Sequence, residues 1–66
     1  MANKVSENIR RIRLEKNISQ DRLSKDADLA LNTVVKIEND ESPNPTVDTL
    51  EKIAKALGVS VTELFQ

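Results

Sequence analysis

Apolar residues recur three and four positions apart along this chain, and residues that cap or end helices bound each stretch. Val5, Ile9 and Ile12 form the first such stripe, and Val34 with Ile37 begins another. Side chains at this spacing share one face of a helix, whereas a strand needs alternation. One glycine, two prolines and a single aromatic residue also disfavour strands. The pattern predicts an all-α fold without a sheet.

Capping and turn residues predict the first two helices. The first begins at Asn3 or Ser6, either of which can cap it, and ends near Lys16. Asn17 tolerates the left-handed backbone that follows many helices, so the chain turns there. Ser19 then caps a second helix.

A tight turn separates the second helix from a third. The second helix runs to about Ala27, and Asp28 can take the left-handed conformation that reverses the chain. The third helix turns Val34 and Ile37 inward and ends near Asn39. Two short helices therefore flank a tight turn, which is the arrangement of a helix-turn-helix.

Two more helices are expected in the last third of the chain. Thr46 caps the fourth helix and Gly58 ends it. Ser60 to Glu63 forms a capping box, and Val59 with Leu64 forms a hydrophobic staple, so a short fifth helix follows. The predicted inward face of the fourth helix consists of Val47, Leu50, Ile53, Ala54 and Leu57.

The length and the missing residue types exclude several functions. A chain of 66 residues has room for a single domain, residues 1–66. Without cysteine or histidine there is no disulfide, thiolate metal site or histidine-based catalytic group. We therefore expect a protein that is not an enzyme, with no catalytic residue, metal, cofactor or evident small-molecule ligand. No apolar run approaches the roughly 20 residues of a membrane span, so we expect a cytoplasmic protein without a membrane partner.

Charge is distributed unevenly along the chain, although the net charge is only −1. Residues 1–25 carry seven basic and three acidic side chains, a net +4. Residues 26–48 carry one basic and six acidic side chains, a net −5. The nearly neutral total argues against a nucleic-acid binder, and the two blocks are typical of a small domain with two solvated faces. Charge alone therefore does not identify the partner.

The outward face of the third helix carries side chains that can read DNA. In a helix-turn-helix the second helix of the motif lies in the major groove. There asparagine can bind adenine, lysine can donate to guanine, and aliphatic side chains can contact thymine methyl groups. Exposed aliphatic residues are also common without a function. The outward stripe consists of Leu31, Asn32, Val35 and Lys36.

Three segments in order resemble one family of DNA-binding proteins. They are IRRIRLEKNISQDRLS (residues 9–24), TVVKIEND (residues 33–40) and NPTVDTLEKIAKALGVSVTELF (residues 44–65). From Val5 to Phe65 the chain is similar to the Cro/phage-repressor (XRE) family of helix-turn-helix regulators. The resemblance implies a compact five-helix, lambda-repressor-like DNA-binding domain whose second and third helices form the helix-turn-helix.

The resemblance also implies which residues contact double-stranded DNA. The base-reading positions are Gln20, Leu31, Asn32, Val35 and Lys36. The phosphate positions are Ser19, Gln20, Thr33, Asn39 and Asn44. Arg13 and Glu38 match a pair that joins the first helix to the end of the third in relatives, so Glu38 has a structural role.

The chain departs from the family pattern at two turns, one cap and one loop. Asn17 and Asp28 replace the usual glycines, and both residue types still allow a left-handed turn. Ala30 replaces a serine or threonine cap, which costs the third helix about 0.5–2 kcal/mol. Asp40 and Glu41 stand where relatives often carry bases, so we expect weak non-specific binding with a shallow salt dependence.

These features predict a sequence-specific transcriptional regulator that binds a partly symmetric operator as a homodimer. A repressor, a restriction-modification controller protein and a regulator of a mobile element share this body plan. The alternative is an antitoxin-like module that binds a partner protein and contacts DNA secondarily. The dimer interface is predicted at Val61, Leu64 and Phe65, unless Phe65 simply closes the core.

Overall fold

The computed structural model describes residues 4–41 and 45–66 of the chain, and these two ranges are helical with no strand. The predicted all-helical fold is therefore confirmed for them. Asn3 and Asn44, which the sequence proposes as a cap and a phosphate contact, lie outside the described residues. The elements are α1 (Lys4–Glu15), α2 (Gln20–Asp26), α3 (Leu31–Glu38), α4 (Val47–Leu57) and a 3-10 helix, η1 (Val61–Phe65).

The same backbone arrangement ends all four α-helices. Asn17, Asp28, Asp40 and Gly58 have left-handed φ angles of 58°, 57°, 58° and 74°. The amide that follows each of them donates to the carbonyl five positions earlier, over 2.8–3.1 Å. This is the hydrogen bond of a Schellman motif, which satisfies a carbonyl at the helix end. The sequence predicts the turns at Asn17, Asp28 and Gly58, and Asp40 is a fourth that it does not.

Hydroxyl caps begin two of the helices. The Oγ of Ser19 accepts a hydrogen bond from the amide of Arg22 over 3.0 Å, and the Oγ1 of Thr46 accepts one from the amide of Thr49 over 3.1 Å. Both caps are as predicted from the sequence. Ser6, in contrast, is buried within α1, so it does not cap that helix.

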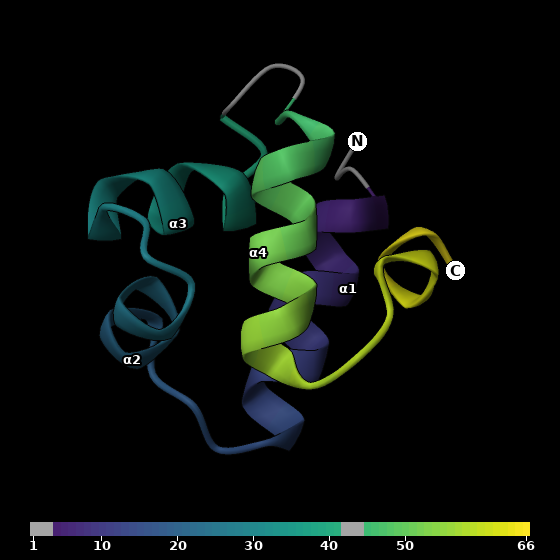
Figure 1. Cartoon of the computed structure of the whole chain (residues 1–66), viewed down its shortest axis with the longest axis horizontal. Coiled ribbons are helices and arrows are strands. Elements are labelled where there is room, and N and C mark those ends of the chain that lie inside the picture. Colours follow the sequence, from purple (N-terminus) through teal and green to yellow (C-terminus); the bar gives the residue numbers. More distant parts are fainter. Residues whose placement is uncertain (1–3, 42–44) are drawn as a thin grey trace.

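All five elements contribute to one hydrophobic core. Figure 1 shows α4 crossing the middle of the molecule in front of α1, with α2 and α3 on one side and η1 on the other. None of the described helices has the length and apolar character that a membrane span requires. The core residues are Ile9, Ile12, Leu23, Val34, Ile37, Leu50, Ile53, Ala54, Leu57 and Leu64.

The prediction that Val47 faces the core is wrong, because its side chain is 66% exposed. Val47 is the first residue of α4 and lies at the edge of the apolar arc of that helix. The other four residues of the predicted inward face are buried. An exposed valine is therefore left at the start of an otherwise well-buried helix.

The predicted short fifth helix is present as a 3-10 helix, but the capping box predicted at its start does not form. The Ser60 side chain makes no capping hydrogen bond, and the amide of Glu63 donates to the Ser60 carbonyl over 3.1 Å. Bonds from residue i+3 to residue i wind the chain more tightly than those of an α-helix. Leu64 is fully buried in this tight turn, and its carbonyl accepts a hydrogen bond from Nδ2 of Asn8 over 2.9 Å. The segment is thus held against α1.

Candidate nucleic-acid interface

α2 and α3 pack against each other across a short turn, as a helix-turn-helix requires. Leu23 of α2 and Val34 of α3 are both buried in the core. Between the helices, the amide of Leu29 donates to the carbonyl of Ser24 over 2.8 Å, which closes the turn. The two helices therefore have a fixed relative orientation.

The outer face of α3 is exposed as the apolar spacing predicts. Val34 and Ile37 are buried, whereas Asn32 and Lys36 are exposed and Leu31 is 43% exposed. The two polar side chains can donate to base edges, and the asparagine can also accept. The face therefore presents donor, acceptor and apolar groups to the surroundings. Val35, the remaining member of the predicted stripe, and Thr33 are half-buried.

Arg13 and Glu38 form a nearly buried ion pair between α1 and the end of α3. The guanidinium Nε lies 2.6 Å from Oε2 of Glu38, and Nη2 donates to Oε1 over 3.0 Å. The exposed fractions of the two side chains are only 10% and 2%. Nη1 of Arg13 also donates to the carbonyl of Ile18, just before the cap of α2, over 2.8 Å. One side chain thus links α1, the start of α2 and the end of α3.

Gln20 joins this pair, which the sequence does not predict. Its Nε2 donates to Oε1 of Glu38 over 3.1 Å, and the residue is half-buried at the first position of α2. The hydrogen bond brings the start of α2 next to the end of α3. Ser19, Gln20 and Asn39 therefore come from two elements that meet at one place, which the spacing of the residues in the chain does not indicate. The roles of these residues in DNA binding stay predictions.

The other residues predicted to contact phosphate lie at both ends of α3 and at the cap of α2. Asn39 is exposed, and its Nδ2 donates to Oε1 of Glu41 over 3.3 Å. Thr33 lies in the first turn of α3, at the opposite end of that helix from Asn39. Ser19 already accepts the capping hydrogen bond of α2 with its Oγ, so its hydroxyl hydrogen remains the group that can donate to a phosphate.

The exposed charges of α2 form pairs within the helix. Arg22 lies 3.1 Å from Asp26, and Lys25 lies 3.1 Å from Asp21. Each pair joins residues four positions apart and stays largely in solvent. The basic side chains of α2 are therefore balanced by neighbouring acids, which weakens their attraction to phosphate.

The predicted dimer residues at the end of the chain do not share one exposed surface. Leu64 is fully buried, so its assignment to an interface is wrong: the core already covers it. Phe65 is 55% exposed and does not close the core, and Val61 is half-buried against it. Val61 and Phe65 retain surface that a partner could cover.

Comparisons with known proteins agree on the kind of domain. Residues 9–64 match the helix-turn-helix family model HTH_3. The restriction-modification controller protein C.AhdI from Aeromonas hydrophila is 29% identical with a TM-score of 0.89, over 94% of this chain and 92% of that one. Wild-type controller protein C.Esp1396I is 40% identical with a TM-score of 0.84, over 94% and 79% of the two chains.

A third similar structure is a complex of the SinR and SinI proteins. The identity is 32% and the TM-score 0.88, over 94% of this chain and 60% of that one. A comparison with curated protein sequences gave no match.

Proposed function

This chain belongs to the XRE-type helix-turn-helix family of DNA-binding regulators, and from this premise we propose that it controls transcription as a homodimer on a partly symmetric operator. Two of the similar structures are restriction-modification controller proteins. We place the chain among small regulators of the controller or repressor type, acting on DNA in the cytoplasm and without a catalytic role.

α3 is the DNA-reading helix in this proposal. The observation that supports it best is that Asn32 and Lys36 are exposed on a helix whose other face is buried in the core. Placed in the major groove, Asn32 binds adenine, Lys36 donates to guanine and Leu31 offers its apolar surface to thymine methyl groups. α2 then crosses the DNA backbone, with Gln20 at its first position next to phosphate.

The size of α3 supports a homodimer. The helix has only eight residues, so one copy reaches few base pairs. Two copies reading half-sites about 34 Å apart double the length of sequence that is read. Occupancy then depends on protein concentration, which suits a regulator that controls its own level.

Selection of bound oligonucleotides from a random pool tests this function. The parent protein is expected to select a partly symmetric site. Asn32→Ala and Lys36→Ala should each relax the preference at particular base positions. Lys25→Ala is the matched control, because it removes a positive charge from α2 and should affect all sequences alike. If both α3 variants select the same sequences as the parent, the assignment of α3 as the reading helix is wrong.

A further inference from the structure

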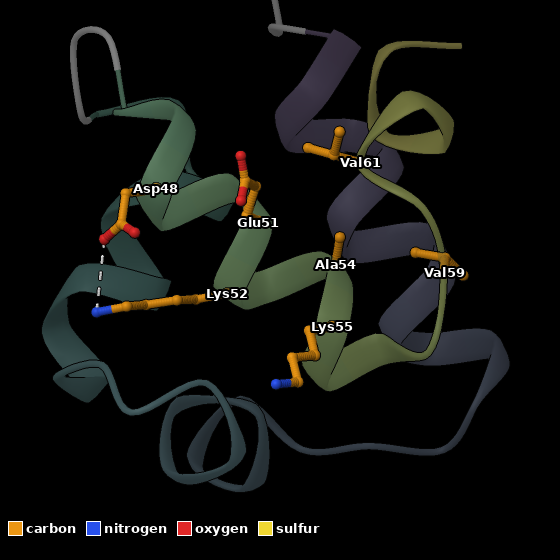
Figure 2. Close-up of a pocket in the computed structure, with 7 residues that line it drawn as sticks. All are labelled: Asp48, Glu51, Lys52, Ala54, Lys55, Val59 and Val61. Carbon is orange, nitrogen blue, oxygen red and sulfur yellow. Dashed lines mark ion pairs between the residues drawn. The ribbon is translucent and has the colours of Figure 1, made fainter.

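The hydrogen bond between Gln20 and Glu38 differs from the exposed ion pairs of the molecule. Apart from Arg13 with Glu38, each ion pair among the described residues joins two exposed side chains four positions apart in one helix. Figure 2 shows one of them, Asp48 with Lys52, among the charged side chains of α4 that line an open groove of about 510 Å³. Gln20 instead contacts a carboxylate of another helix, and that carboxylate is buried. The packing of the helices therefore fixes this contact.

Arg13 holds the carboxylate to which Gln20 is bound. Its guanidinium contacts both oxygens of Glu38, over 2.6 Å and 3.0 Å, and also donates to the carbonyl of Ile18. A bidentate pair of this kind holds both partners in one orientation. Oε1 of Glu38 accepts from Nη2 of Arg13 and from Nε2 of Gln20. Gln20 is thus bound to an acceptor that cannot turn away.

The carboxylate also determines which end of the Gln20 amide faces it. An ionised carboxylate only accepts hydrogen bonds, whereas a glutamine amide has a nitrogen that donates and an oxygen that accepts. The nitrogen of Gln20 therefore faces Glu38, as the structure shows. One N–H of Nε2 is occupied by this bond, and the second N–H remains able to donate.

The second N–H suits a DNA phosphate, whose oxygens accept hydrogen bonds. We propose that Glu38, held by Arg13, is a positioning residue for DNA binding, because it fixes the Gln20 amide with one N–H free for the DNA backbone. The proposal rests on the proposed function, which places Gln20 next to phosphate. An amide that is fixed in advance loses less conformational freedom when DNA binds.

Replacement of the ion pair by neutral side chains tests this role without leaving a buried charge. The apolar variant carries Arg13→Met with Glu38→Leu and has no acceptor for Gln20. The acceptor variant carries Arg13→Met with Glu38→Gln, whose amide oxygen can still accept from Gln20. Both keep the net charge of the parent. On the selected DNA site the apolar variant should bind about threefold to tenfold more weakly than the parent, and the acceptor variant should recover most of this loss.

Gln20→Met distinguishes a role through Gln20 from a general loosening of α3. Methionine has no N–H in its side chain, so it leaves no amide to position. With Gln20→Met present, the apolar and acceptor variants should bind DNA equally. An apolar variant that remains the weaker of the two in this background would act through the fold, and the positioning role would be wrong.

Neutralisation of single phosphates locates the contact. A duplex with one methylphosphonate lacks the charge of one phosphate. The phosphate bound by Gln20 is the one whose replacement weakens the parent but has little effect on Gln20→Met. The apolar variant should lose sensitivity at that phosphate, and the acceptor variant should keep it. A merely structural role of Glu38 would leave the sensitivity of both variants unchanged.

Side-chain NMR of the parent tests the fixed amide without any substitution, so it applies even if the apolar variant does not fold. Asn32 carries an exposed amide on a shorter side chain, which makes it a strict reference. Nitrogen relaxation should give Nε2 of Gln20 a higher order parameter than Nδ2 of Asn32. A Gln20 amide as mobile as that of Asn32 overturns the proposal.

Arg11→Gln with Glu15→Gln is the matched control, because it removes an exposed ion pair without changing the net charge. Arg11 contacts Asn8, which holds η1 on the opposite side of α4 from α2 and α3 (Figure 1). This variant should bind the selected site as the parent does. If the parent selects no DNA sequence, the proposed function fails and the positioning role fails with it. If the parent selects a site and the apolar variant binds it with unchanged affinity, only the positioning role is wrong.

Discussion

The two ends of α3 are held by different means. At its C-terminal end the carboxylate of Glu38, 2% exposed, accepts hydrogen bonds from Arg13 and Gln20. At its N-terminal end Ala30 makes no side-chain capping hydrogen bond. The comparison indicates that α3 is anchored firmly at its C-terminal end and weakly at its N-terminal end, with Asn32 near the weak end.

The largest expected loss of stability comes from removing the ion pair that holds the C-terminal end of α3. Arg13→Ala removes three hydrogen bonds and leaves Glu38 as a buried charge without its cation. Such a change costs about 3–5 kcal/mol in the free energy of unfolding. Urea unfolding measures this loss.

A double variant tests the same ion pair in case Arg13→Ala does not fold. Arg13→Met with Glu38→Leu replaces the pair by apolar side chains and leaves no buried charge. Replacement of a buried pair in this way is often neutral or stabilising. The double variant should therefore be much more stable than Arg13→Ala. A loss below about 1 kcal/mol for Arg13→Ala would show that the pair does not anchor the helix.

Substitutions on the outer face of α3 should weaken DNA binding and leave the stability of the fold nearly unchanged, which is the opposite of the effect expected for Arg13→Ala. Asn32→Ala and Lys36→Ala remove exposed side chains, so the free energy of unfolding should change by less than about 0.5 kcal/mol. Each should weaken binding to the selected DNA site by about 1–3 kcal/mol. Fluorescence anisotropy with a labelled duplex measures the loss. If Asn32→Ala and Lys36→Ala instead destabilise the fold and bind the DNA site with unchanged affinity, the outer face of α3 contributes to folding and not to DNA binding.

Adding a capping side chain at the N-terminal end of α3 should anchor that end more firmly and stabilise the fold. Ala30→Ser supplies an oxygen that can accept from the amides of the first turn, which adds about 0.5–2 kcal/mol to the free energy of unfolding. Hydrogen exchange of the first-turn amides should slow. Ala56→Ser is the control, because the same hydroxyl inside α4 is not expected to stabilise the fold. If Ala30→Ser does not raise the free energy of unfolding, the amides in the first turn of α3 do not need a capping side chain.

The smallest expected effect comes from an exposed ion pair. Arg22 and Asp26 lie 3.1 Å apart with side chains 70% and 41% exposed. Solvent and salt screen such a pair, so Arg22→Ala should change the free energy of unfolding by less than about 0.5 kcal/mol. Thermal unfolding beside Arg13→Ala gives the comparison directly. If Arg22→Ala and Arg13→Ala lower the free energy of unfolding by similar amounts, burial does not explain why the Arg13–Glu38 pair is expected to matter more.

The local features of the chain were predictable from its sequence. The turns at Asn17, Asp28 and Gly58 and the caps at Ser19 and Thr46 all have their expected geometry. Each depends on a backbone preference and on hydrogen bonds that span five residues or fewer. Such contacts form wherever the residues occur, so the sequence is enough to predict them.

Three features near the C-terminal part were not predictable in the same way. Val47 fits the apolar arc of α4 but is exposed, and Leu64 was assigned to an interface but is buried. Ser60 begins the motif of a capping box, yet its side chain makes no capping bond. The periodicity of one helix does not say how far the neighbouring elements extend over it, and that extent determines whether a residue at the edge is covered.

The sequence by itself determined where α1 ends, where α2 and α4 begin and end, which face of α3 is apolar, and the family to which the chain belongs, because these properties depend on neighbouring residues or on motifs. The tertiary structure decided that Gln20 meets Glu38, that Asn8 holds the carbonyl of Leu64 from 56 positions away, and that the charges of α4 border a groove. These contacts join residues from different elements. Their geometry follows from how the helices pack, and no local pattern specifies it.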